Sequence, residues 1–418
     1  MLVVFDGVGD ESADAGRFPP GHGTQQVDVA AARAAERACE PDTFPDQQRP
    51  GPGRLVAHRL RIVPPHPGRR VTPTSEVGRA PCDVYFPPRM PLVNASPYQA
   101  ADLPWVDAEG NALVIAIVKG TFVVDREGRT TRAEEPTSLR VDDVPLDPDN
   151  PNCSAKYPSD MGDCKVGTDV VVVGEAVAPR RTKVMDLAVR VRETTVPLRV
   201  HGERVFYKGM AGVVVGPAAE FERMPIVYER AYGGSSDDLS MVELCNPAGR
   251  GVAKSPNDLI DKPAPQIEHP AFPHTTAKDK HPPVGFASIR THWGPRRDYI
   301  GTIDEEWKAA RMPLMPRDFD PRYFNVAHPS LQFDPPLMPG DAIAVMGMSE
   351  ALFRFELPPL HLVVRGTFDV AGTVEVRPQV DTVLVEPTTR RVDVVARVRF
   401  KMGRGRNVLR EIQVDTDE

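Results

Sequence analysis

The sequence predicts a mainly β protein: antiparallel sheets in two related β-rich halves, joined by long loops rich in proline, glycine and aromatic residues, with few short helices. Proline makes up 45 of the 418 residues, about twice its usual share, and it disfavours helix interiors. Several segments show the period-two alternation that is typical of strands. Parts of these segments recur later in the sequence in the same order, which favours two related halves.

Residues 1–89 differ from the rest of the protein. They hold eleven arginines and no lysine, and only residues 27–40 have a helical pattern, made mostly of alanine. Such a segment buries too little apolar surface to offset its ordering entropy, so we expect it to be disordered. An alternative stays open: translation begins at Met90, and the preceding residues are not part of the translated protein.

The first β-rich half is predicted for residues 90–222. LVIAIVKGTFVVD, which begins at Leu113, is dominated by β-branched residues, and these favour strands. DREG at 125–128 has the composition of a hairpin turn. An insertion at about 132–168, which contains Cys153 and Cys164, separates this strand from the next. These two cysteines and the other three, Cys39, Cys82 and Cys245, form an odd, scattered set, so we expect free thiols rather than a disulfide framework.

The C-terminal half, residues 341–418, repeats words of the first half. HLVVRGTFDV at 361–370 matches VIAIVKGTFVV through V-K/R-G-T-F, and RVDVVARVR at 391–399 matches VMDLAVRVR at 184–192. Chance similarity between β-rich sequences is the alternative. Two matched words in the same order nevertheless favour related halves that pack together.

Alternation predicts which side chains of the repeated strands share a face. Leu187 and Val189 oppose Asp186 and Arg190 in the first copy, and Val394 and Val398 oppose Asp393 and Arg397 in the second. A strand with one apolar and one charged face is typical of an antiparallel sheet with one side in water. We therefore expect the valines and leucines to be buried and the charged residues to face solvent.

A loop-rich segment, residues 223–340, lies between the halves. It contains the words RMPIVYERAYGG at 223–234, NPAGRG at 246–251, GFASIRTHWGPRRDYIGTIDEEW at 285–307 and MPLMPRDFDPRYFN at 312–325. The best helical candidate is DEEWKAARM at 304–312, with Thr302 or Asp304 as its N-cap. Long loops with many aromatic residues favour a folded recognition surface over a catalytic pocket.

Charge and hydropathy argue against a nucleic-acid-binding, membrane-inserted or secreted protein. The formal net charge of −7 gives no reason to expect nucleic acid or an anionic membrane as a partner. No apolar run approaches the roughly 18–20 residues that a membrane-spanning helix needs. The N-terminus lacks the basic region of a secretory signal. We therefore expect a cytoplasmic protein without membrane insertion.

The best candidate for enzymatic chemistry is a group of histidines in the central segment: His269, His274, His281 and His292, with Glu268 and Asp279 nearby. Their irregular spacing through a proline-rich loop does not require them to converge tetrahedrally on a metal. Nucleophile-elbow and phosphate-loop motifs are absent from the sequence. We therefore predict no catalytic residue, metal or cofactor; a metal-dependent hydrolase using the loop from His269 to His292 is the alternative.

The central segment also supplies candidate partner-binding residues, because Tyr, Trp and Arg dominate binding hot spots. The predicted set is Tyr228, Arg230, Tyr232, Trp293, Arg296, Arg297, Tyr299 and Trp307. The alternative is that these side chains pin the loops onto the β-core. Some of them can do both.

The four central words, in this order, resemble a bacterial family of unknown-function domains whose genes occur in type VI secretion clusters. The resemblance covers residues 90 to about 360 and includes the MPLVNASPYQA start and the KGTF strand. It implies a non-enzymatic adaptor or chaperone that helps load a toxic effector onto the secretion spike. The implied partners are the effector and a spike-tip protein.

Overall fold

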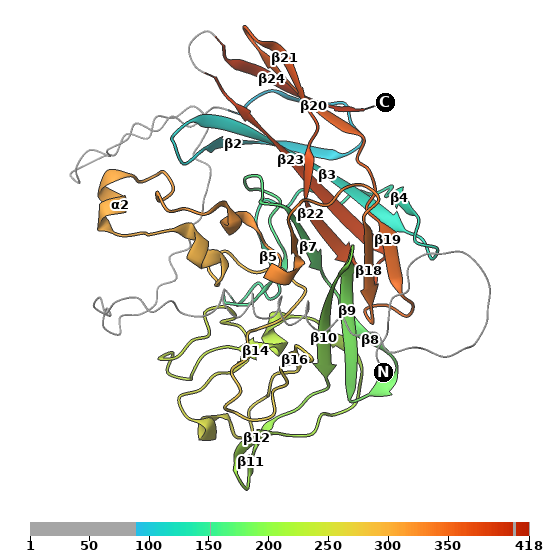
Figure 1. The fold of residues 1–418 in the computed structure, drawn as a ribbon, viewed down its shortest axis with the longest axis vertical. Coiled ribbons are helices and arrows are strands. Elements are labelled where there is room, and N and C mark those ends of the chain that lie inside the picture. The colour runs from blue at the N-terminus through green and yellow to red at the C-terminus, as the bar shows by residue number, and fades with distance from the viewer. Residues whose placement is uncertain (1–88, 151, 404–406, 418) are drawn as a thin grey trace.

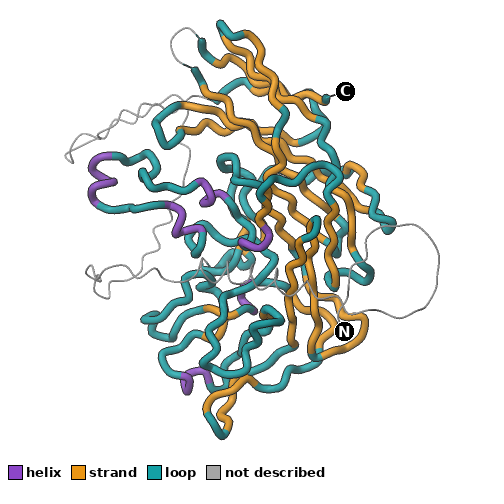
Figure 2. The backbone as a smooth tube through the Cα atoms, in the orientation of Figure 1, coloured by secondary structure: helices purple, strands orange, loops and turns teal. Residues whose placement is uncertain are grey.

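The computed structural model describes residues 89–150, 152–403 and 407–417. These residues form 24 strands, five short 3₁₀ helices and one α-helix, so the prediction of a mainly β fold is confirmed (Figures 1 and 2). The expectations for residues 1–88 lie outside the described residues. Within the described ranges, no helix is long and apolar enough to cross a membrane.

The largest sheet has seven strands and joins both predicted halves. Its strands, in spatial order, are β17 (Gln332–Phe333), β7 (Thr168–Val172), β22 (Gln379–Glu386), β23 (Arg391–Lys401), β3 (Ala112–Val124) and β2 (Gln99–Val106), with β4 (Thr130–Arg132) paired to β3. β3 and β23 pair antiparallel along their length, from Leu113 opposite Lys401 to Val123 opposite Arg391. The sheet is mixed, because β7 and β22 run parallel.

Two further sheets complete the main strand layers. The five-stranded sheet contains β16 (Ile267–Glu268), β10 (Thr194–His201), β9 (Val184–Val191), β18 (Ala342–Met346) and β19 (Phe353–Glu356). The four-stranded sheet contains β1 (Leu92–Asn94), β24 (Leu409–Thr416), β20 (Leu362–Phe368) and β21 (Gly372–Val376). The central loop-rich segment lies beside these sheets (Figure 1).

The remaining elements are short. Two-stranded pairs are formed by β5 (Val144–Pro145) with β6 (Ala155–Tyr157), β8 (Glu175–Thr182) with β13 (Phe221–Pro225), β11 (Phe206–Gly209) with β12 (Gly212–Val215), and β14 (Tyr232–Gly233) with β15 (Arg250–Gly251). The helices are η1 (Tyr228–Arg230), η2 (Pro256–Leu259), η3 (Arg296–Ile300), α2 (Glu305–Ala310), η4 (Pro321–Phe324) and η5 (Pro329–Leu331).

Two local predictions are confirmed. The turn between β3 and β4 is closed by a 3.2 Å hydrogen bond from the Gly128 amide to the Asp125 carbonyl, and Gly128 has φ +92°. α2 lies inside the predicted helical stretch, and Asp304 is its N-cap because its carboxylate accepts from the Trp307 amide at 2.7 Å. A third prediction, of free cysteines, is only partly correct: Cys153 and Cys164 are free thiols, but Cys245 is disulfide-bonded.

The apolar faces of the repeated strands are buried, as predicted. Leu187 and Val189 of β9 and Val394 and Val398 of β23 belong to one hydrophobic core, and none of the four is more than 4 % exposed. Burying side chains of this size stabilises the fold by about 1.5–3 kcal/mol each. Alternation therefore identified correctly which side of each strand faces the core.

The expectation of a solvent-facing charged side is wrong for β23. Asp393 and Arg397 are buried, at 2 % and 5 % exposure. The insertion predicted at 132–168 covers them: Arg140 contacts Asp393 at 3.2 Å, and the backbone carbonyl of Asp160 accepts from Arg397 at 2.6 Å. The charges remain buried because each has a partner of opposite charge or a hydrogen-bonded dipole.

The matching strands of the two halves have different neighbours. The KGTF strand β3 pairs with β2, β4 and β23, whereas the RGTF strand β20 pairs with β21 and β24. Strands from the two halves also share the seven-stranded sheet. The relation between the halves and the division into the proposed segments stay predictions.

Candidate functional site

Two of the central words interlock into one structural unit. β14, within RMPIVYERAYGG, pairs in parallel with β15, within NPAGRG. Asn246 is fully buried and donates to the carbonyls of Tyr228 and Tyr232, both at 2.8 Å. Gly233 has φ +145°, and a Cβ there would lie 2.2 Å from the Asn246 carbonyl oxygen. This close approach explains why the first word ends in glycine.

The largest aromatic residues of the predicted binding set are buried. Trp293 is 0 % exposed and Tyr228 is 2 % exposed, and their rings meet edge-to-face with centroids 5.8 Å apart. Burial raises the pKa of the Tyr228 hydroxyl well above its usual range. These rings hold residues 228 and 293 together across the loop segment. Both side chains are almost completely buried in this structure, and their role in partner binding stays a prediction.

Arg296 is also a structural pin. Its Nε donates to the Tyr323 carbonyl at 3.0 Å and its Nη1 donates to the Ile289 carbonyl at 2.7 Å. The guanidinium also lies 5.6 Å from the centroid of the Tyr323 ring. Only 6 % of the surface of Arg296 is exposed, so its contacts in this structure are internal, and its role in partner binding stays a prediction.

Two further residues of the set have internal partners. Tyr232 is buried and stacks on His274 with a centroid distance of 5.1 Å, and burial raises its pKa to about 12. Arg230 is half-buried and donates to Glu203 at 2.7 Å and to Gln266 at 2.6 Å. Tyr232 is therefore almost completely buried, whereas Arg230 remains partly accessible, and partner binding by either residue stays a prediction.

Arg297, Tyr299 and Trp307 remain accessible. The Arg297 side chain is 44 % exposed and lies 3.5 Å from Asp298. Tyr299 and Trp307 are half-buried; the Arg322 guanidinium lies 4.4 Å from the Tyr299 ring centroid, and the Trp307 indole donates to the Leu314 carbonyl at 2.9 Å. α2, which carries Trp307, lies at the outer edge of the loop-rich segment (Figure 1).

Three of the four predicted histidines come together, but in a row of rings. His274 and His281 have ring centroids 5.0 Å apart, His281 and Phe272 5.7 Å, and Phe272 and His269 5.3 Å. His292 is exposed and lies beside Trp293 instead. This arrangement packs the proline-rich loop by aromatic contacts.

The carboxylate of Glu268, which lies 3.5 Å from Nδ1 of His274, already accepts from three donors. Glu268 is 2 % exposed and accepts from Arg204 at 2.7 Å, from His201 at 2.7 Å and from the His274 amide at 2.9 Å. Burial alone would raise the pKa of Glu268, but these donors hold it well below its usual range. Across the described residues, no group of three His, Cys, Asp or Glu side chains is arranged to hold a metal.

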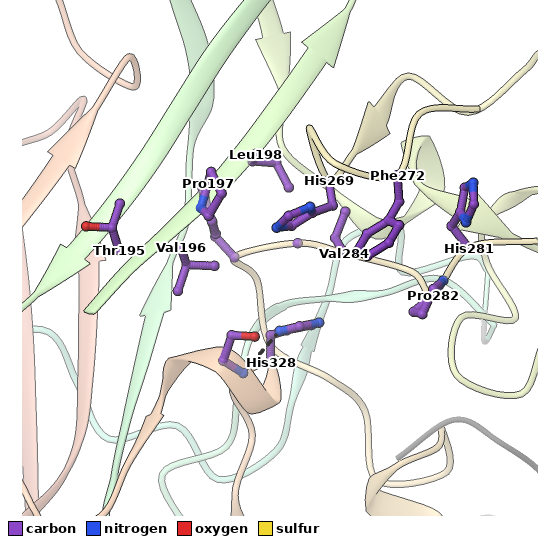
Figure 3. A pocket seen from close by; sticks show the side chains of 13 residues that line it. Thr195, Val196, Pro197, Leu198, His269, Phe272, His281, Pro282, Val284 and His328 are labelled. Atoms are coloured by element: carbon purple, nitrogen blue, oxygen red, sulfur yellow. Dashed lines mark hydrogen bonds between the residues drawn. The ribbon is translucent and has the colours of Figure 1, made fainter. Parts of the chain in front are cut away.

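A small cavity of about 30 Å³ lies between β10 and the histidine loop. Its walls include Val196, Leu198 and Phe272, together with the histidines His269, His281 and His328 (Figure 3). Burial lowers the pKa of His328 to about 4, so this imidazole is neutral near pH 7. A cavity of this size holds a water molecule or a small group.

The sequence interpretation missed three residues around Arg230: Glu203, Arg250 and Gln266. Arg250 was visible in the word NPAGRG but was not singled out as a candidate. Nothing in the spacing of the three residues indicates that they meet, because each comes from a different short strand or loop.

The geometry describes a mainly β protein in which buried side chains fix a loop-rich segment and leave part of it accessible. Residues 109–397 match the model of the DUF2169 family, uncharacterized proteins conserved in bacteria. This protein belongs to that family. No curated protein and no solved structure matches it.

Proposed function

We propose that this protein is a non-enzymatic adaptor or chaperone of the bacterial cytoplasm. It binds an effector of a type VI secretion system and helps to load it onto the secretion spike, where a spike-tip protein is a second partner. The resemblance of the four central words to proteins encoded in such gene clusters supports this proposal. Membership of a bacterial family of uncharacterized proteins is compatible with it.

One observation supports the proposal most directly. Arg297, Tyr299 and Trp307 are accessible on a segment whose base is fixed by the buried Trp293 and Arg296. Partner surfaces use aromatic and arginine side chains as anchors, and anchors held in advance lose less entropy on binding. A rigid base under accessible anchors is the arrangement that a binding protein needs.

The alternative of a metal-dependent hydrolase has no such support. The ring of His281 contacts those of His274 and Phe272, and Phe272 also contacts His269. Glu268 is held by an arginine and by two other donors. None of these side chains is arranged with a second one as a nucleophile and its base.

The test is capture of a purified type VI secretion effector by this protein. Arg297→Ala or Trp307→Ala should weaken binding by about 1–3 kcal/mol, the usual range for a hot spot, through faster dissociation. Surface plasmon resonance measures the dissociation rate. Arg180→Ala, an exposed arginine on β8, is the matched control and should leave the rate unchanged.

Replacing a buried residue that stabilises the fold should give a different result in the same assay. Trp293→Ala should lower the free energy of unfolding by about 3–5 kcal/mol, because it empties a fully buried site. Any loss of capture should then follow the loss of folded protein. Unchanged dissociation rates in folded Arg297→Ala and Trp307→Ala would reject this surface as the binding face.

A further inference from the structure

Three short backbone segments bring a set of hydrogen-bond donors together beside β14. The Gln266 amide donates to the Arg230 carbonyl at 2.7 Å, and the Arg250 amide donates to the Ala231 carbonyl at 3.0 Å. Residues 230, 250 and 266 are therefore fixed relative to one another by backbone hydrogen bonds. Their side chains meet at the edge of the interlocked unit described above.

The two arginines share one acceptor. Nη1 of Arg230 lies 2.6 Å from Oε1 of Gln266, and Nη1 of Arg250 lies 3.0 Å from the same oxygen. Two guanidinium groups in such proximity repel each other, and both are largely withdrawn from water, with side-chain exposures of 21 % and 26 %. Burial, and then the charge of Arg230, lower the pKa of Arg250. An anion between them relieves this repulsion.

Glu203 supplies that anion only in part. Its Oε1 accepts from Arg230 at 2.7 Å, but its Oε2 lies 3.7 Å from Arg250, and its side chain is 60 % exposed. Burial would raise the pKa of Glu203, yet the hydrogen bond from Arg230 and the charges of Arg230 and Arg250 lower it. Gln266 is fully buried, and its Nε2 has no hydrogen-bond partner among the residues that the structure describes.

We propose that Arg230, Arg250 and Gln266 form a carboxylate-binding site, that Glu203 occupies it in the isolated protein, and that a carboxylate of a bound polypeptide displaces Glu203. A carboxylate has two oxygens with about four lone pairs, so it can accept from both guanidinium groups and from the buried amide. The displaced Glu203 is already exposed, so its return to water costs little.

The inference rests on the proposed function in one respect only: that the carboxylate belongs to a polypeptide partner. Two sources of a carboxylate share this chemistry: the side chain of an Asp or Glu residue and the carboxyl terminus of a polypeptide. Two small molecules distinguish these sources without any effector. N-acetylaspartate amide represents the carboxylate of a side chain, and N-acetylglycine represents the carboxyl terminus. Failure of the adaptor proposal therefore leaves the test of the site intact.

The experiment measures thermal unfolding of the full-length protein with each probe. Sodium chloride at equal ionic strength and the neutral N-acetylasparagine amide are the references. Glu203→Gln frees the donors, and its unfolding midpoint should rise by about 2 °C when a carboxylate probe is tenfold above its dissociation constant. The wild type should respond less, because Glu203 competes. Adding Arg250→Gln to Glu203→Gln should abolish the shift.

Asp186→Asn is the matched control. It removes a carboxylate of similar exposure, 50 %, from an ion pair with a single arginine, Arg199. A carboxylate-specific shift in Glu203→Gln that is absent from Asp186→Asn supports the site. Equal shifts in the two variants, or no shift in Glu203→Gln, overturn it. If Glu203→Gln does not fold, Glu203→Asp, with its shorter reach, should show the same response at smaller size.

Discussion

Strands β9 and β23 share the pattern D-x-x-x-R-V-R, yet the structure treats their charged faces differently. Both bury their alternate apolar residues in one core. In β9, Asp186 is 50 % exposed and pairs with Arg199 of the neighbouring strand. In β23, the equivalent Asp393 is 3 % exposed as a side chain and contacts the fully buried Lys119 at 3.3 Å.

The difference arises from a covering segment. The insertion at 132–168 lies over β23 and β3, and Asp160 from that insertion contacts Lys119 at 2.9 Å. Among the residues that the structure describes, no comparable segment covers the half-exposed Asp186. The same sequence pattern therefore gives a charged face that is exposed to solvent in β9 and buried in β23. A buried charged side chain is stabilised by its ion-pair and hydrogen-bond partners, whereas an exposed one is stabilised mainly by water.

The largest expected effect separates the two aspartates. Asp393→Ala should lower the free energy of unfolding by about 3–5 kcal/mol, because it removes a partner from the buried cations Lys119 and Arg140. Asp186→Ala should cost at most about 1 kcal/mol. Urea denaturation measures both. Equal costs would show that the cover does not determine the energetics.

A second prediction uses pH to compare a covered histidine with an exposed one. Burial lowers the pKa of His328 to about 4, although the nearby Pro283 carbonyl opposes this shift and His269 adds to it. The unfolded protein therefore binds a proton below pH 6.5 that the folded protein excludes. This contribution is complete above pH 6.5 and decreases as the pH falls to 4, by about 3 kcal/mol in all.

The measurement is the free energy of unfolding of wild type and His328→Asn between pH 7 and pH 4. The variant should lose this part of the pH dependence, since asparagine does not titrate. His361→Asn, at an exposed position, is the control and should keep the wild-type profile. A His328→Asn profile parallel to that of the wild type would mean that the ring is accessible to protons in the folded protein.

The smallest effect concerns salt. A double-mutant cycle on Arg199 and Asp186 should give a coupling energy of about 0.5 kcal/mol that vanishes near 1 M NaCl, because exposed charges are screened. The cycle on Lys119 and Asp393 should change little with salt, since both side chains are buried. Coupling that falls equally in both cycles would show that water reaches the covered face.

Much of the fold followed from the sequence. Local steric and hydrogen-bonding preferences predicted the β3 strand, the turn at Asp125–Gly128 and the Asp304 cap, because each depends on neighbours within a few residues. The candidate site was less predictable. Composition selected Trp293 and Arg297 for the same reason, yet one is buried and the other exposed.

By itself the sequence determined the β class, the period of its strands and the residues that share each face, since these are properties of the local backbone and of side-group chemistry. Only the tertiary structure decided which faces are covered and which distant groups meet. Lys119 with Asp393, and Arg230 with Arg250 and Gln266, come together because separate segments pack side by side. That packing depends on many contacts at once, and no spacing between residues encodes it.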